Sequence, residues 1–274
     1  MRDLWVPVSG AIAQQKRVET IANNVANANT AGFKRDQMVF KEYLTALDKG
    51  HYDIDLPNRE FAPRDFYHSY GAESAKVKVD GTYTDFSQGQ LTPTSNQFDF
   101  ALHGPGFFEV LGPNGVRYTR QGNFTLNSQG HLVTNEGHPV LKRLSEQDMR
   151  EGNEIPRPED RIVEIGNHSP TINLQGEIFV AGQKIGDLSV VEFNDPHALK
   201  KQGQSFFINH DDANRKVDTP KTAIHQGFIE QSNINAVAEM SDLIRAHRNF
   251  ESIQRIIKTY DDISSKGVNE ISRF

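Results

Sequence analysis

Apolar residues near the C-terminal end of the chain recur at intervals of three and four, the period of an α-helix and not of a strand. The pattern runs from about residue 235 to 265 and comprises Val237, Met240, Leu243, Ile244, Phe250, Ile253, Ile256, Ile257, Tyr260 and Ile263. Suitable N-cap residues are Ser232, Asn233 and Asn235, and Gly267 is a suitable end. Such a helix is about 45 Å long, so we expect it to need a partner of similar length.

A second helical pattern lies at the other end of the chain. Between residues 4 and 25 the spacing alternates between four and three, which is the heptad spacing of a coiled-coil seam. The seam comprises Leu4, Val8, Ala11, Gln15, Val18, Ala22 and Val25, thickened by Ile12 and Ile21. Two interpretations fit both patterns: the terminal helices close a hairpin within one chain, or they form a coiled-coil layer shared between subunits.

Four asparagines follow within one short stretch, at positions 23, 24, 27 and 29. Asparagine inside a helix costs about half a kcal/mol relative to alanine, so a helix that contains four of them needs a reason. Either the helix ends here, with Asn29, Thr30 and Gly32 forming its exit, or the amides bond to neighbouring chains.

The pattern then changes twice. Residues 36–74 hold a short amphipathic piece around Val39 and Phe40, followed by a stretch without a clear period that contains Pro57 and Pro63. We interpret this part as an extended connector or arm. From about residue 75 to 228, short period-two runs alternate with turn signals, which is typical of an antiparallel β domain. The candidate strands are residues 76–79, 98–102, 107–110, 116–119, 124–126, 162–165, 178–180, 188–193 and 206–208.

The chain is therefore predicted to have an α+β fold with long N- and C-terminal helices forming a coiled-coil layer and a central antiparallel all-β domain. Its expected parts are an N-terminal helix, an extended connector, the β domain and a C-terminal helix, covering residues 1–35, 36–74, 75–228 and 229–274. The charged, aperiodic residues 145–161 predict a surface excursion. A chain whose ends meet while its middle forms a separate module is typical of a radially arranged subunit.

Charge and composition narrow the function. The net charge of −6 divides into +3 for residues 1–35, −1 for residues 230–274 and therefore −8 for the middle, which argues against nucleic acid as a partner. The absence of cysteine excludes disulfides and thiolate metal sites. No stretch approaches the length of an apolar membrane span, and the N-terminal end lacks the features of a cleaved signal peptide. Composition alone would place the protein in the cytoplasm.

Candidate chemistry is weak throughout. The ten histidines show no metal-ligand spacing, and Asp53 and Asp55 in the connector are better explained as solvated side chains. Gly104, Pro105 and Gly106 fit a tight turn between strands better than a phosphate-binding loop. No nucleophile elbow or catalytic triad is visible in the sequence. We therefore expect no catalytic residues, no cofactor and no metal.

Three blocks of the sequence resemble the bacterial flagellar rod and hook axial proteins. Residues 14–35 are similar to the N-terminal signature of that family, residues 88–141 to the start of its β domain and residues 226–263 to its C-terminal helix. Ser95 and Pro105 depart from the family pattern in local turns. The length fits a basal-body rod protein better than a hook protein, and among rod proteins the proximal rod type is preferred over the distal.

This resemblance implies a structural protein and not an enzyme. Terminal helices would surround a narrow export channel, with the β domain outside, so that the chain polymerises into a hollow helical shaft that transmits torque for motility. Its partners would be copies of itself, other axial proteins of the rod and hook, and the flagellar type III export apparatus. It would work in the periplasmic portion of the basal body after export without a cleaved signal peptide.

We predict the subunit interface on both terminal helices. Its apolar members would form the packed layer, and its asparagines would bond across that layer and fix the register. The predicted residues are Val8, Val18, Ile21, Asn23, Asn24, Val25, Asn27, Asn29, Met240, Ile244, Phe250 and Ile257. The ends are expected to be largely disordered in the monomer and to fold on assembly. Alternatives are a distal rod or hook subunit, or a secreted β-domain adhesin or tethering protein.

Overall fold

The computed structural model describes residues 5–44, 75–144, 157–166, 168–203, 205–216 and 221–271. Leu4, the arm at residues 50–74 with Asp53 and Asp55, and most of the predicted surface excursion lie outside these residues. The chain divides into two compact units. Unit 1 comprises residues 1–25, 36–83 and 236–274, and unit 2 comprises residues 26–35 and 84–235.

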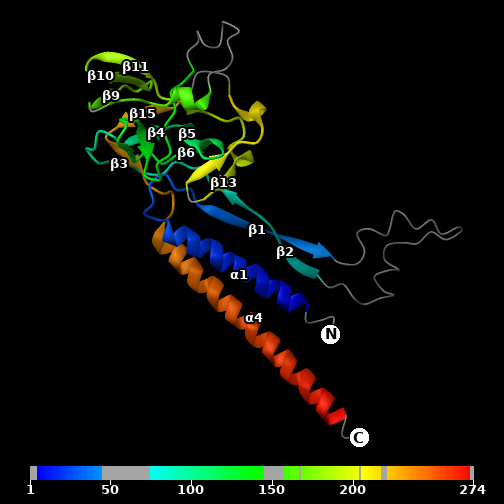
Figure 1. The fold of residues 1–274 in the computed structure, drawn as a ribbon. Helices are drawn as coiled ribbons and strands as arrows, with labels where there is room; N and C mark the ends of the chain where they lie inside the picture. Colours follow the sequence, from blue (N-terminus) through cyan, green and yellow to red (C-terminus); the bar gives the residue numbers. More distant parts are fainter. Residues whose placement is uncertain are drawn as a thin grey trace, which may run out of the picture. The chain divides into compact units, whose positions relative to one another are not determined.

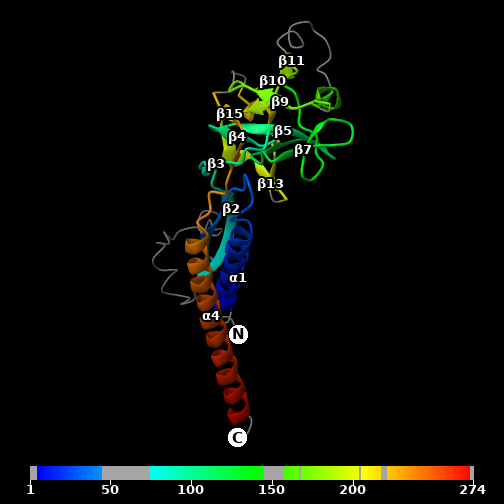
Figure 2. The ribbon, with the colours of Figure 1, turned by 90° about the vertical axis from the view of Figure 1, so that its left-hand side faces the viewer.

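Unit 1 is built on two helices that run side by side in opposite directions (Figures 1 and 2). Helix α1 spans Trp5–Ala26 with 22 residues, and helix α4 spans Ala236–Ile271 with 36 residues. Their lengths are therefore about 33 Å and 54 Å. As a result, α4 continues well beyond the start of α1. The predicted end at Gly267 was wrong, because α4 runs through this glycine to Ile271.

Small residues mark the sides of α1 and α4 that are buried. A Cβ atom added to Gly10 of α1 would lie 3.8 Å from Ile253 Cδ1 of α4, which is ordinary van der Waals contact. Ala13 and Ala246 are each 2% exposed. Side chains this small let two helix backbones approach closely, and for this reason α1 turns its Gly10 and Ala13 side inward. Among the described residues of the predicted seam, Ile21 is buried, four are half-buried and three are exposed. The half-buried residues are Val8, Ala11, Val18 and Val25, and the exposed residues are Ile12, Gln15 and Ala22.

A two-stranded ribbon completes unit 1. Strand β1 (Asp36–Leu44) pairs with strand β2 (Ala75–Thr84). Residues 36–44 are thus a strand and not an amphipathic piece within a connector. The Asn24 side chain holds the start of β1, because its Nδ2 donates to Asp36 O at 2.9 Å and its Oδ1 accepts from Asp36 N at 3.1 Å.

Unit 2 is an antiparallel β structure in which every described strand pair is antiparallel. The main sheet has the order β12-β5-β6-β14-β13, a second has the order β11-β10-β9, and β15-β4, β16-β3 and β7-β8 are two-stranded. The strands are β3 (Leu91–Pro93), β4 (Phe100–His103), β5 (Phe107–Gly112), β6 (Gly115–Thr119), β7 (Phe124–Leu126), β8 (Leu132–Thr134), β9 (Pro170–Ile172), β10 (Glu177–Val180), β11 (Gln183–Asp187), β12 (Val190–Val191), β13 (Lys200–Gln202), β14 (Phe206–Ile208), β15 (Ala223–Gln226) and β16 (Phe228–Glu230). Three single-turn 3-10 helices, η1 (Pro158–Arg161), η2 (Pro196–Ala198) and η3 (Asp212–Asn214), lie between them.

Two apolar clusters form the core of unit 2. The larger gathers inward residues of many short strands, among them Phe100, Phe108 and Ile178, each fully buried. The smaller packs Phe107 against Phe193 and Phe207 with ring centroids 5.6 and 5.7 Å apart. Aromatic pairs at such distances are favourable beyond their buried area. The core therefore depends on the period-two pattern that predicted a β domain.

Most predicted strands of unit 2 are present, with shifted ends. Residues 162–165 are an exception, because they form only isolated bridges, Leu141 with Ile162 and His131 with Glu164. The predicted strand at 188–193 is reduced to β12. Within the described residues, no helix is long and apolar enough to cross a membrane. The same residues contain no cluster of three metal-ligating side chains.

Candidate assembly site: the helix faces and a buried charge cluster

The asparagine-rich segment after α1 is a built exit from the helix. Thr30 N donates to Asn27 O at 3.1 Å, and Thr30 Oγ1 donates to Asn27 Oδ1 at 3.2 Å. Gly32 follows with φ of 67°, and a Cβ atom there would lie 2.5 Å from the carbonyl carbon of Arg120. Only glycine fits this left-handed position against another backbone. The first of the two alternatives for this segment is therefore what the structure shows.

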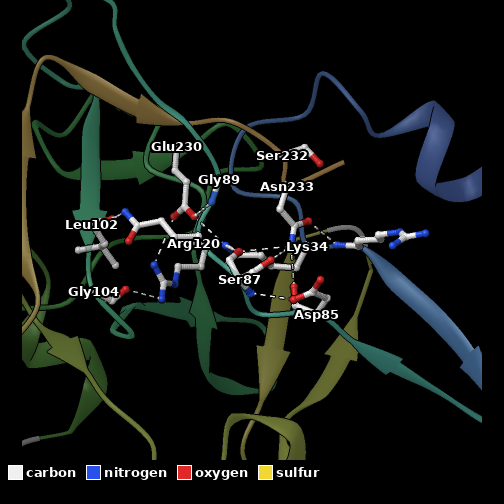
Figure 3. A network of polar contacts seen from close by, with 12 residues as sticks. Lys34, Asp85, Ser87, Gly89, Leu102, Gly104, Arg120, Glu230, Ser232 and Asn233 are labelled. Carbon is white, nitrogen blue, oxygen red and sulfur yellow. Dashed lines mark hydrogen bonds and ion pairs between the residues drawn. The ribbon is translucent and has the colours of Figure 1, made fainter. Parts of the chain in front are cut away.

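A buried carboxylate joins this exit to the segment that leads into α4. Glu230 Oε1 accepts from Lys34 Nζ at 2.6 Å and from Gly89 N at 2.9 Å, and Glu230 Oε2 lies 3.3 Å from Arg120 Nη1 (Figure 3). The three charged side chains are at most 2% exposed. Gly32 N also donates to Glu230 O at 2.7 Å. Glu230 therefore bonds the segment that follows α1 to the segment that precedes α4.

The two cations of this cluster have further partners. Lys34 Nζ donates to Ser87 O at 2.7 Å, and Arg120 Nη2 donates to Gly104 O at 2.7 Å. The guanidinium of Arg120 also lies 4.9 Å from the ring centroid of Phe107, a cation–π distance. Burial lowers the pKa of Lys34 and of Arg120 from their ordinary values, and the charge of Glu230 acts in the opposite direction. The hydrogen bonds and ion pairs of the two cations thus offset the cost of removing their charges from water.

Asn233 extends the cluster towards α4. Its Oδ1 accepts from Arg35 N at 2.8 Å, and its Nδ2 donates to Asp85 O at 2.8 Å (Figure 3). Three stretches, at residues 30–35, 85–89 and 230–233, are therefore bonded to one another immediately outside the two helices. We call the group of Lys34, Arg120, Glu230 and Asn233 the junction cluster.

Apolar residues of α4 form two exposed stripes. The first stripe is Val237, Met240 and Ile244, which are 76%, 54% and 54% exposed. The second stripe is Ile256, Tyr260 and Ile263, which are 49%, 48% and 63% exposed. At about 100° per residue, the first stripe lies roughly 140° around the helix from the face that contains Ala246 and Phe250. The α4 helix thus has apolar surface on more than one side.

The residues predicted for the subunit interface differ in how far they are buried within the single chain. Met240, Ile244, Asn23 and Asn29 are exposed. Val8, Val18, Val25, Phe250 and Ile257 are half-buried, and Ile21, Asn24 and Asn27 are buried. The amides of Asn24 and Asn27 bond within the chain.

Sequence reasoning missed the junction cluster. Lys34, Arg120 and Glu230 each lie in one of the three blocks that carry the family resemblance, at residues 14–35, 88–141 and 226–263. The available signal was that each of the three blocks contains one of these charged residues. Their mutual contact over as many as 196 positions of sequence separation was not visible from any local pattern.

Comparison with protein families matches three parts of the chain. Residues 4–34 match the family described as "Flagella basal body rod protein", residues 101–180 match "Flagellar hook protein FlgE/F/G D1 domain", and residues 225–270 match "Flagellar basal body rod FlgEFG protein C-terminal". The first and third matches contain most of the two terminal helices.

Whole-length relatives agree with these matches. The chain is 30% identical to the flagellar basal-body rod protein FlgG of Buchnera aphidicola subsp. Schizaphis graminum, with 96% of this chain and 97% of the relative covered. It is also 30% identical to the flagellar basal-body rod protein FlgF of Caulobacter vibrioides, with 98% of each covered. A solved structure of the Helicobacter pylori flagellar hook protein FlgE2 is 23% identical over 30% of this chain and 24% of its own, with a TM-score of 0.21.

Replacing Glu230 by glutamine tests the junction cluster. The change keeps the shape and leaves two buried cations without a counterion, so we expect unit 2 to lose about 3 to 5 kcal/mol of unfolding free energy. Urea unfolding followed by near-ultraviolet circular dichroism measures the loss. The matched control is Glu164→Gln, because Glu164 is 70% exposed and its change should stay within about 0.5 kcal/mol. Equal effects of the two substitutions would contradict the role assigned to Glu230.

Proposed function

Because the chain belongs to the family of flagellar basal-body rod proteins, we propose that this structural subunit of the rod polymerises through its terminal helices into a hollow shaft that transmits torque. The observation that carries the proposal is the pair of exposed apolar stripes on α4. A single chain leaves these side chains in contact with water, and contiguous apolar surface of this kind marks an interaction site. Burying what remains exposed of each side chain would contribute about 1 kcal/mol.

The contact between subunits is proposed to be heterologous. Different faces of one helix would meet different neighbours, and a rotation that does not close then builds a helical tube. Met240 and Ile244 on α4 would supply the outward packing, together with the half-buried Val8, Val18 and Val25 on α1. Asn23 and Asn29 would supply exposed amides. Phe250, Ile257 and the buried Ile21, Asn24 and Asn27 would support the layer from within each subunit.

The chain's place in the cell follows from its family. It belongs to the basal body, and we propose that it works in the periplasmic portion after passing unfolded through the flagellar export apparatus without a cleaved signal peptide. The absence of cysteine supports this route, because no disulfide can form that would block threading. Its partners would be copies of itself and other axial proteins, and we propose no catalytic role.

A charge placed in the first stripe should stop assembly without unfolding the protein. Ile244→Asp is expected to abolish swimming, because the aspartate would be desolvated in the packed layer. The control is Leu174→Asp in unit 2, since Leu174 is 52% exposed and Ile244 is 54% exposed. Motility in soft agar measures the effect, and near-ultraviolet circular dichroism checks that both variants stay folded. Swimming cells with Ile244→Asp would exclude the first stripe from the interface.

The terminal helices should gain order on assembly. With 22 and 36 residues, α1 and α4 together hold about a fifth of the 274-residue chain. We expect the full-length monomer to show much less helix than this by circular dichroism at 222 nm, because the apolar stripes have no partner in solution. Assembled rods should show the full amount. A monomer that already contains all of it would refute coupled folding.

We place the subunit in the proximal part of the rod. The relatives carry both the FlgF and the FlgG name at 30% identity, so the test is made on the organelle itself. Basal bodies from cells lacking this chain should end in a short stub, because later subunits need earlier ones to build on. Electron cryotomography compares their length with the wild type. A nearly complete rod that lacks only its outer end would place the subunit distally.

A further inference from the structure

The side of α4 that meets α1 extends beyond the level of the described part of α1. Gly10 is level with Ile253 and the helices are antiparallel, so Trp5, where the described part of α1 begins, is level with about residue 258. From there α4 continues to Ile271, which is about 20 Å of helix. Figures 1 and 2 both show this continuation. We call residues 258–271 the α4 extension.

The heptad pattern of the contact face continues into this extension without a break. Steps of four and three connect Ala246, Phe250, Ile253, Ile257, Tyr260, Ser264 and Gly267. Exposure rises along the series, from 2% at Ala246 through half-buried positions to 48% at Tyr260. Ile263 flanks the same face and is 63% exposed. A regular coiled-coil seam therefore continues on α4 beyond the level of the described part of α1.

The extension also repeats the small residues of the contact within the chain. Gly10 and Ala13 let α1 lie close to α4, where Ala246 is buried. Ser264 and Gly267 occupy seam positions of the extension, and nothing lies within 4 Å of a Cβ atom added to Gly267. A helix of the α1 type can thus approach the extension as closely as α1 approaches the first part of α4.

We propose that the α4 extension binds helix α1 of a second copy of this chain. The inference rests on the proposed function, since it names the partner of the assembly surface. The second α1 would continue the line of the first along one α4, in the same antiparallel orientation. Each α4 would then hold its own α1 and that of a neighbour, which links successive copies along one continuous seam. The first stripe, on a different side of α4, remains available for another neighbour.

Disulfide mapping in assembled rods tests this proposal, because the chain has no cysteine of its own. Ile263→Cys is combined in turn with a cysteine at Ala13, Arg17, Thr20 or Ile21, which lie on the same side of α1 as Gly10. Within one copy the nearest of these is level with residue 250, about 20 Å from residue 263 along the helix. A disulfide needs Cα atoms within about 7 Å, so any bond formed must join two copies.

The expected result is a ladder of disulfide-linked multimers from purified basal bodies for at least one of the four pairs. Asp262→Cys with the same α1 positions is the matched control, because residue 262 points away from the seam and should give no ladder. Equal linking from Asp262→Cys, linking of Ile263→Cys to itself alone, or no linking in rods that contain the protein would overturn the inference. If the wild-type chain is missing from purified basal bodies, the proposed function itself fails.

Discussion

The rest of the structure depends on one buried carboxylate. Glu230 accepts from Lys34 and Gly89 and pairs with Arg120, in a site where all three charged side chains are at most 2% exposed. Lys34 follows α1 and Glu230 precedes α4, so their bond brings together two chain segments that are far apart in sequence. The bond fixes the segment that follows α1 to the segment that precedes α4. Removing one partner would leave an uncompensated buried charge, which strongly destabilises the folded state.

The helix α4 differs from unit 2 in how much of its apolar surface is exposed. Unit 2 buries its apolar residues in two cores, whereas α4 leaves Val237, Met240, Ile244, Ile256, Tyr260 and Ile263 about half or more exposed. A rod protein needs this contrast, because apolar side chains that are already buried within one chain cannot pack against the next chain. The β unit can therefore be stable in the monomer while the helices gain their packing from assembly.

Sequence reasoning identified what repeats locally. The helical periods predicted both terminal helices, and the period-two runs predicted β4 to β7, β10 and β14 close to their observed positions. It failed where tertiary contacts decide. Val39 and Phe40 fit a helix as well as a strand, and only the pairing of β1 with β2 decides between them. Gly10 and Ala13 face inward because small residues fit there, and the heptad pattern of α1 could not show this. The junction cluster joins positions from three distant blocks, and no local pattern encodes such a contact.

The junction cluster specifies one arrangement of the chain more than it maximises stability. Two cations around one carboxylate do not maximise stability, since burial lowers the pKa of both Lys34 and Arg120 and apolar residues of the same size often pack as well. Apolar packing, however, can slide to a neighbouring fit, whereas directional bonds at 2.6 to 2.9 Å to Glu230 Oε1 fix one register. The bonds therefore hold the segment that follows α1 and the segment that precedes α4 in one fixed arrangement. An apolar cluster of the same size would stabilise the fold as well but would not specify that arrangement as closely.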